Sequence, residues 1–354
     1  MKTSKSIFLY TTALMVTVIT FSCKKHKDAA PQTLTVSTLA GSGINGDADG
    51  SGATAQFTTV IGMTSDAQGN IYVTSGQAIK KITPSGQVST LAGIYNQNGF
   101  VNGAGSQARF SNPSGLAIDA AGNVIVADAS NNCIRKITAS GVVSTVAGDG
   151  NTGNTNGNGI AARFNTPYDV ALDASGNIFV ADLLNNRIRK IDAGGNVSTY
   201  AGSAGGFADG SVSSALFNGP YGLATDKQGN VYVSDRYNKR IRKIAITGTV
   251  TTIAGNDNIG LINGPAASAT FSPSIMGVKV ADNGDIYVAD RDNYCIRKIS
   301  GGEVSTYAGS GISGFADGNP STAQFKYPWG LALYGNTLYV ADALNYRIRK
   351  VAFQ

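Results

Sequence analysis

The strongest constraint on the fold is a repeated unit that runs through the chain. A Val-(Ala/Ser)-Asp motif ends in an aspartate at intervals of 52 to 55 residues, at Asp128, Asp182, Asp235, Asp290 and Asp342. An earlier copy, NIYVTSGQAIKKI, carries Ser75 at the same place. Six copies of one unit therefore account for nearly the whole chain after its N-terminal segment. A fixed period of this length is typical of repeat architectures, in which each unit is one supersecondary element.

Each unit is predicted to hold four short β-strands. In the copy that begins at Phe110, β-branched and apolar runs occupy residues 116–119, 123–127, 133–137 and 142–147. Gly, Asn and Pro separate these runs, as in tight turns between strands, and no segment has a sustained helical period. Radial repetition of four-stranded sheets produces the β-propeller. The predicted fold class is therefore all-β.

The two ends of the chain are expected to share one blade. Ile-(Lys/Arg)-Lys and Val-(Ser/Thr)-Thr-x-Ala-Gly each occur six times, but the second motif precedes the first repeat and is missing after the last. We expect residues 34–40 to pair as the outermost strand beside residues 346–352. The prediction is a six-bladed propeller of four-stranded antiparallel blades, whose last blade is closed by the N-terminal strand. Closure also removes an exposed sheet edge.

The repeat resembles the NHL-repeat family. The pattern P-x-G-L-A-x-D-x-x-G-N-x-Y-V-A-D-x-x-N-x-x-I-R-K is matched well by the copies that begin at Pro113, Pro167, Pro220 and Pro328. Departures occur at Tyr334 in the last copy and at Lys279 and Ala281 in the fifth. The resemblance implies the propeller fold. It leaves the function open, because the family includes protein binders, RNA binders, sensors and a few enzymes.

Residues 1–22 are predicted to be a secretory signal. Lys2 and Lys5 precede an apolar run, and Cys23 follows a small residue. This arrangement resembles a bacterial lipoprotein signal, which implies that Cys23 is lipidated; plain secretion is the alternative. Residues 23–33 would then be a lipidated tether and residues 34–354 the propeller. The expected location is the cell envelope, outside the cytoplasm, in the periplasm or at the cell surface, with the lipid as the only membrane contact.

The charge of the chain argues against a nucleic-acid partner. The formal charge is +6, but the signal and tether contain five lysines and one aspartate. From Leu34 onward 23 basic residues face 21 acidic ones, a net charge of +2. Nucleic-acid binding depends on a concentrated basic surface, which this balance does not provide. Cys133 and Cys295 occupy the same place in repeats three units apart, too distant for a disulfide, and are expected to be free, semi-buried thiols.

Missing residue types exclude several kinds of catalytic site. The only histidine is His26, in the tether, and the only glutamate is Glu303, at the start of an expected outermost strand. A Ser-His or Cys-His nucleophile system within the propeller is therefore excluded, and no catalytic residue is assigned. A hydrolase or lactonase-like enzyme that uses Asp, Lys or Tyr at the channel mouth remains the alternative.

Two sets of acidic residues are candidate metal ligands. The repeated aspartates each end a strand before an Asn-rich turn, where a structural role through hydrogen bonds to backbone N–H groups is the better interpretation. Asn45, Asp47 and Asp49, in the segment NGDADG, resemble the start of a calcium loop. The twelfth position is Gln56 rather than glutamate. No cofactor is expected, with Ca²⁺ at this loop as the alternative.

The mouth of the axial channel is the predicted ligand-binding site. The residue after the repeated proline enters each innermost strand there, and across the six copies it is Ile61, Ser114, Tyr168, Tyr221, Ser274 and Trp329. The repeat is also broken at two neighbouring positions, by Asp169 in place of Gly and by Lys279 in place of Ala. Aromatic faces beside a few polar groups suit a sugar. The alternative is that the rings only plug the channel.

These observations predict a non-enzymatic binding protein. The expected partner is a glycan or an envelope protein, bound at the channel mouth or on the face that carries the long loops between repeats. We expect a monomer.

Overall fold

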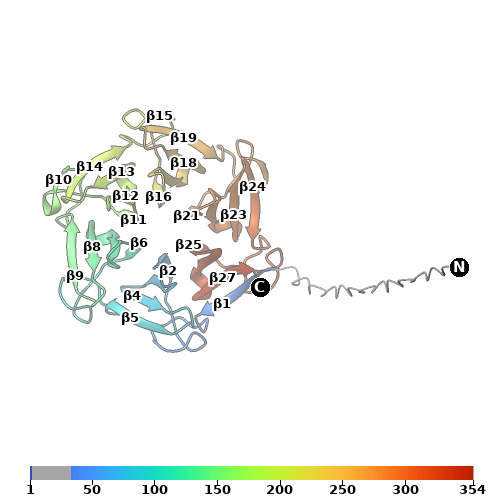
Figure 1. Cartoon of the computed structure of the whole chain (residues 1–354). Helices are drawn as coiled ribbons and strands as arrows, with labels where there is room; N and C mark the ends of the chain where they lie inside the picture. Colours follow the sequence, from blue (N-terminus) through green and yellow to red (C-terminus); the bar gives the residue numbers. More distant parts are fainter. Residues whose placement is uncertain (2–32, 354) are drawn as a thin grey trace. The chain divides into compact units, whose positions relative to one another are not determined.

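Six antiparallel sheets are arranged around a central axis in the computed structural model of the protein (Figure 1). The structure describes Met1 and residues 33–353. The predicted signal, Cys23 and the tether to Gln32 lie outside the described residues. The prediction of a six-bladed, nearly all-β propeller is confirmed. Among the described residues no helix is long and apolar enough to span a membrane.

The innermost strand of each blade lines the axis. These strands are β2 (Val60–Ser65), β6 (Pro113–Ile118), β11 (Pro167–Leu172), β16 (Pro220–Thr225), β21 (Ile275–Val280) and β25 (Pro328–Tyr334). The second strands follow after a tight turn. They are β3 (Ile71–Ser75), β7 (Val124–Asp128), β12 (Ile178–Asp182), β17 (Val231–Asp235), β22 (Ile286–Asp290) and β26 (Thr337–Asp342).

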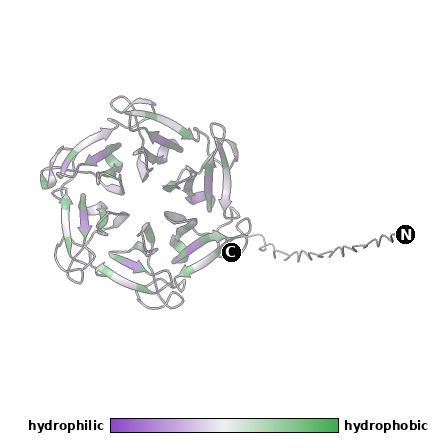
Figure 2. Cartoon of the chain, in the orientation of Figure 1, coloured by the Kyte–Doolittle hydropathy of each residue, from purple (hydrophilic) through white to green (hydrophobic). Residues whose placement is uncertain are grey.

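A one-turn 3-10 helix joins the second and third strands in five blades. These helices are η1 (Ala129–Asn131), η3 (Leu183–Asn185), η4 (Arg236–Asn238), η5 (Arg291–Asn293) and η6 (Ala343–Asn345). The third strands carry the Ile-(Lys/Arg)-Lys motif. They are β4 (Ala78–Ile82), β8 (Cys133–Ile137), β13 (Arg187–Ile191), β18 (Arg240–Ile244), β23 (Cys295–Ser300) and β27 (Arg347–Phe353). Figure 2 shows these strands, for example β4, β8 and β27, as hydrophilic segments inside the blades.

The outermost strands confirm the predicted seam. They are β5 (Val88–Gly93), β9 (Val143–Ala147), β14 (Asn196–Ala201), β19 (Thr249–Ala254), β24 (Glu303–Ala308) and, in the last blade, β1 (Leu34–Ala40). Strand β1 runs antiparallel to β27, from the pair Leu34–Phe353 to the pair Ala40–Ile348. The strand missing from the last repeat is therefore supplied by the other end of the propeller.

A short loop segment covers the outer edge of each blade, a feature that the sequence pattern did not predict. In three blades it forms a two-residue strand: β10 (Gly157–Asn158), β15 (Gly210–Ser211) or β20 (Gly264–Pro265). One more 3-10 helix, η2 (Gly159–Ala161), follows β10. In the other blades single bridges join Gly50 to Val88, Gly103 to Val143 and Gly318 to Val36. These contacts occupy backbone groups that an open edge strand would expose.

A buried ion pair occupies the interior of five blades. The repeated aspartate and the arginine of Ile-Arg-Lys are both fully buried, 2.6 to 2.9 Å apart: Asp128–Arg135, Asp182–Arg189, Asp235–Arg242, Asp290–Arg297 and Asp342–Arg349. Asp235 also accepts hydrogen bonds from the Asn218 N–H and the Asn238 side chain, each at 2.8 Å. The guanidinium of Arg242 lies 5.1 Å from the ring centroid of the buried Phe217. The structural interpretation of the repeated aspartates is therefore confirmed.

Cys133 and Cys295 are free thiols, as predicted. They are fully buried rather than semi-buried, because Gly148 and Gly309 pack directly against their Cα and Cβ atoms.

Candidate functional site

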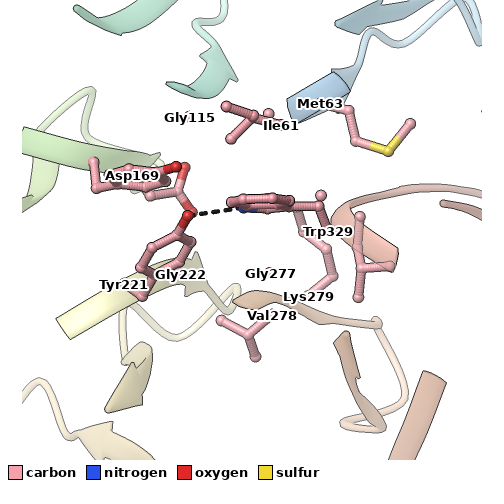
Figure 3. Close-up of a pocket in the computed structure, with 14 residues that line it drawn as sticks. Ile61, Met63, Gly115, Asp169, Tyr221, Gly222, Gly277, Val278, Lys279 and Trp329 are labelled. Carbon is pink, nitrogen blue, oxygen red and sulfur yellow. Dashed lines mark hydrogen bonds between the residues drawn. The ribbon is translucent and has the colours of Figure 1, made fainter. Parts of the chain in front are cut away.

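The innermost strands leave a narrow pocket on the axis at the end where they begin (Figure 3). Five of the six strands carry a glycine at their third position: Gly62, Gly115, Gly222, Gly277 and Gly330. A Cβ atom on Gly222 would collide with the carbonyl oxygen of Met276 in the next blade, and one on Gly330 would collide with that of Ile61. The strands approach so closely here that these positions leave no room for a side chain larger than that of glycine. The cavity in the neck itself is small, about 20 Å³, so a ligand larger than a water molecule would bind over it at the mouth.

All five residues that the sequence singled out line this one pocket: Tyr168, Asp169, Tyr221, Lys279 and Trp329. One position of the predicted ring was wrong. Ile275, not Pro273, pairs with Asp290 in the way that Pro167 pairs with Asp182. Met276 is therefore the residue that corresponds to Tyr168, and Ser274 lies before the strand. The fifth repeat contains an additional residue before this strand, so the position counted from its proline was wrong.

The three aromatic rings form a contiguous cluster. The rings of Tyr168 and Tyr221 have centroids 4.0 Å apart, and those of Tyr221 and Trp329 are 6.5 Å apart. The indole N–H of Trp329 donates to the Tyr221 hydroxyl at 2.8 Å, the contact that Figure 3 marks with a dashed line. Tyr221 is only 4% exposed, whereas Tyr168 and Trp329 are half-buried. Tyr221 therefore supports the other two rings, which keep part of their surface exposed at the mouth.

Asp169 and Lys279 provide the charge inside the neck. The carboxylate of Asp169 fills the space beside Gly115 and accepts hydrogen bonds from the N–H groups of Leu223 and Val170, both at 2.8 Å. Burial raises the pKa of Asp169 to about 6, although the charge of Lys279 and the two N–H donors act in the opposite direction. A carboxylate with this pKa changes its charge in the mildly acidic range.

Beyond the neck the channel widens. The second pocket has a volume of about 240 Å³ and is lined by small and hydroxylated residues such as Thr64, Ser65 and Thr225. Lys279 lines both pockets. It replaces the alanine found at the same strand position in four of the other blades, so its ammonium lies where the wide part of the channel meets the neck.

Two arginines at the mouth were missed by the sequence analysis. Arg236 lies with its guanidinium carbon 5.3 Å from the ring centroid of Tyr221, and Arg291 lies 4.7 Å from that of Trp329. Both follow the repeated aspartate directly, a position held by Ala129, Leu183 and Ala343 in three other blades. A position-by-position comparison of the repeats could have found them, because arginine replaces an apolar residue at this position in only two copies.

The candidate calcium loop holds an ammonium group. The amine of Lys80 lies 2.7 Å from Asp49 and 3.1 Å from Asp47, and it also donates to the Asp47 carbonyl oxygen at 2.9 Å. Asp49 corresponds to Asp209 and Asp317, which bind the buried arginines of their own blades. Asn45 instead forms a backbone bridge with Phe57. Ca²⁺ at this loop would have to displace Lys80, and its binding stays a prediction.

Within residues 33–353 no group of three or more His, Cys, Asp or Glu side chains is arranged to hold a metal ion. The pocket itself offers one carboxylate, one ammonium and tyrosine hydroxyls. Burial raises the pKa values of Tyr168 and Tyr221, so both hydroxyls are protonated at neutral pH and can donate hydrogen bonds.

Comparisons with known proteins agree with this architecture. The profile of the NHL repeat matches residues 110–137, 217–244 and 277–299. The protein SUPPRESSOR OF QUENCHING 1 of Arabidopsis thaliana is 29% identical over 281 residues, which are 73% of this chain and 26% of that protein. The chain thus spans about a quarter of this relative's length.

Solved structures share the fold. A protein of unknown function from Bacteroides thetaiotaomicron superposes with a TM-score of 0.72 at 22% identity, over 91% of this chain and 76% of that one. An auxiliary nutrient binding protein from the same organism superposes with a TM-score of 0.69 at 16% identity, over 91% of this chain and 77% of that one. The fold and the matched repeats define a six-bladed β-propeller. Three of its six repeats match the NHL repeat.

Proposed function

We propose that this protein is a non-enzymatic binding protein of the cell envelope that takes up a saccharide at the mouth of its axial channel. The observation that carries the proposal is the aromatic cluster of Tyr168, Tyr221 and Trp329 beside Asp169 and Lys279. The C–H faces of a sugar ring pack on aromatic faces, and its hydroxyls need a few fixed donors and acceptors. The pocket provides both at one place.

The fold comparison supports a binding role. A propeller of the same architecture is described as an auxiliary nutrient binding protein. At 16% identity this likeness alone carries no ligand over to the present chain. The proposal therefore depends on the side chains at the channel mouth.

The proposal includes a lipid anchor at Cys23 and a position outside the cytoplasm. The apolar run before Ser22-Cys23 supports it. A test is metabolic labelling with a fatty-acid analogue in a bacterial host, with Cys23→Ser as the control. We expect label and membrane association in the wild type and neither in the variant. Equal labelling of both would contradict the anchor.

The saccharide proposal is tested by calorimetric titration of a soluble chain that begins at Thr33. The chain is titrated with a panel of neutral and acidic oligosaccharides, and each product mixture is then analysed. Saturable binding without change in the sugar supports the proposal. If no member binds, and a pull-down from the parent envelope captures only protein, the partner is a protein on the loop face and the saccharide proposal is wrong.

An enzyme is the second candidate, because the raised pKa of Asp169 and the nearby Lys279 would suit acid-base chemistry. Turnover of a lactone, ester or glycoside that disappears in Asp169→Asn would support this candidate and exclude the purely binding role.

A further inference from the structure

Arg236 and Arg291 differ from the other arginines of the repeat. In Ile-Arg-Lys both terminal nitrogens of the guanidinium have partners: those of Arg242 donate to Asp235, Asp209, Leu216 O and Ala208 O. By contrast, within residues 33–353 the Arg236 side chain makes one long hydrogen bond, at 3.4 Å to the Ser274 hydroxyl. Arg291 makes one, at 3.1 Å to the partly exposed Asp292. The difference lies in the terminal nitrogens, because buried Nε atoms without a partner among these residues also occur in Arg135, Arg189 and Arg297.

Aromatic rings hold the two guanidinium groups in place. Arg236 lies between Tyr221 and Tyr237, at 5.3 and 5.1 Å from the ring centroids. Arg291 lies over Tyr327 at 4.2 Å, as well as over Trp329. Stacking on aromatic rings fixes a planar guanidinium without using its N–H donors. The two side chains are therefore oriented at the mouth with most of their hydrogen-bonding capacity unused.

The positive charges of Arg236 and Arg291 both act on the Tyr168 hydroxyl. They favour the ionised form of the Tyr168 hydroxyl, which lies beside Tyr221 in the cluster. Three cationic side chains, Arg236, Arg291 and Lys279, thus surround the aromatic cluster, while Asp169 and Asp292 are the nearby carboxylates. The whole propeller carries only a small net charge, so this local excess of positive charge is a property of the mouth.

We infer that the ligand is an acidic saccharide, whose carboxylate or sulfate group binds Arg236 and Arg291 while a sugar ring packs on the aromatic cluster. Paired N–H donors of arginine match the two oxygens of a carboxylate, and sulfate offers a similar edge. The inference rests on the proposed function, since it assumes that a sugar binds at this mouth. It adds the chemical class of the ligand and the residues that select it.

The test uses two probes that differ only in charge. A galacturonic acid pentamer is titrated into the chain that begins at Thr33, and the fully methyl-esterified pentamer is titrated in parallel. A chondroitin sulfate oligosaccharide forms a third arm, which separates recognition of sulfate from recognition of carboxylate. Variants are Arg236→Gln, Arg291→Gln and the charge-conserving Arg291→Lys. Arg163→Gln is the matched control, because Arg163 is a half-exposed arginine in an outer loop that pairs with Asp149.

We expect the wild type to bind an acidic probe at least about tenfold more tightly than the ester, as the loss of one charge-assisted hydrogen bond implies. Each Gln substitution should weaken acidic binding about 10- to 100-fold and leave ester binding unchanged. The affinity of Arg291→Lys for the acidic probe should lie between those of the wild type and of Arg291→Gln. Arg163→Gln should bind like the wild type. Thermal melts identify any variant that has lost its fold.

Each other outcome has a distinct meaning. Equal affinity for acid and ester would overturn this inference and leave the saccharide proposal standing. A preference for the acid that survives both Gln substitutions would overturn the assignment of the two arginines. Failure of every probe and of the wider oligosaccharide panel would overturn the saccharide proposal together with the inference.

Discussion

The interior of the blades and the mouth of the channel are built from the same repeat. The interior residues recur from blade to blade, whereas the residues at the mouth differ. Inside the blades, five aspartate–arginine pairs have the same geometry, with distances that differ by only 0.3 Å. At the mouth, the position after the repeated proline holds six side chains of five kinds, among them Tyr221 and Trp329. Positions that are the same in most blades stabilise the ring. Positions that differ break its symmetry and can form a single site.

The largest effect should come from removing the strand that closes the ring. A chain that begins at Ser42 lacks β1, so β27 has an unpaired edge and the buried side chains of Val36 and Ala40 are lost. We expect destabilisation by at least about 3 kcal/mol and a tendency to aggregate. Thermal melts are compared with those of the chain that begins at Thr33. Identical melts would show that the last blade does not need β1.

The repeated interior is tested by breaking one of its pairs. Asp128→Ala leaves Arg135 buried without a carboxylate partner among the described residues, which should cost about 3–5 kcal/mol. The matched control is Ser75→Ala in the first blade, where the same position is uncharged and accepts a hydrogen bond from the Thr58 N–H. This change should cost about 1 kcal/mol. Equal costs in urea unfolding would contradict the distinction between the two blades.

The mouth should respond to pH through Asp169. Its pKa of about 6 means that it is mostly ionised at pH 7.5 and mostly protonated at pH 5. The groups that face it are Lys279, Tyr168 and the N–H groups of Leu223 and Val170. Loss of a negative charge as the pH falls should strengthen binding of the galacturonic acid pentamer, whose own carboxylates remain ionised.

The size of this effect is up to about tenfold, the equivalent of one pKa unit. Titrations at pH 5 and 7.5 measure it, and Asp169→Asn should remove the pH dependence. Weaker binding at pH 5 than at pH 7.5 in the wild type would contradict this role of Asp169.

The smallest effect is expected from calcium. Lys80 already neutralises Asp47 and Asp49, so millimolar Ca²⁺ should leave the melting temperature of the wild type nearly unchanged. In Lys80→Ala the two carboxylates lose their counter-charge, and Ca²⁺ should then stabilise the protein. Clear stabilisation of the wild type by Ca²⁺, reversed by EDTA, would instead support a metal at this loop.

Most of the fold could be predicted because the same pattern of residues occurs six times in the sequence. Strand order, the seam between residues 34–40 and the C-terminus, and the role of Asp235 and its equivalents all follow from positions that recur. The register error at Ser274 arose where the fifth repeat has no proline at the matching position and carries an additional residue.

The candidate site was harder to predict because it depends on side chains from different blades. Tyr168 and Trp329 could be placed from their repeat positions. The positions of Arg236 and Arg291 depend on how far their long side chains reach across the top of the propeller, which the spacing of the repeats does not determine. Stacking on Tyr221 and Trp329 became visible only in three dimensions.

The most direct test of the account is the intrinsic fluorescence of Trp329, the only tryptophan in the chain. The galacturonic acid pentamer is titrated into the wild type and into the double variant Tyr168→Ala, Tyr221→Ala, both confirmed as folded by their melts. We predict a saturable change in the wild type and an affinity at least about tenfold weaker in the double variant, because the ring of Tyr168 and the ring of Tyr221 that supports the cluster are both lost. Equal binding by both proteins would show that the rings only plug the channel and that the site lies elsewhere.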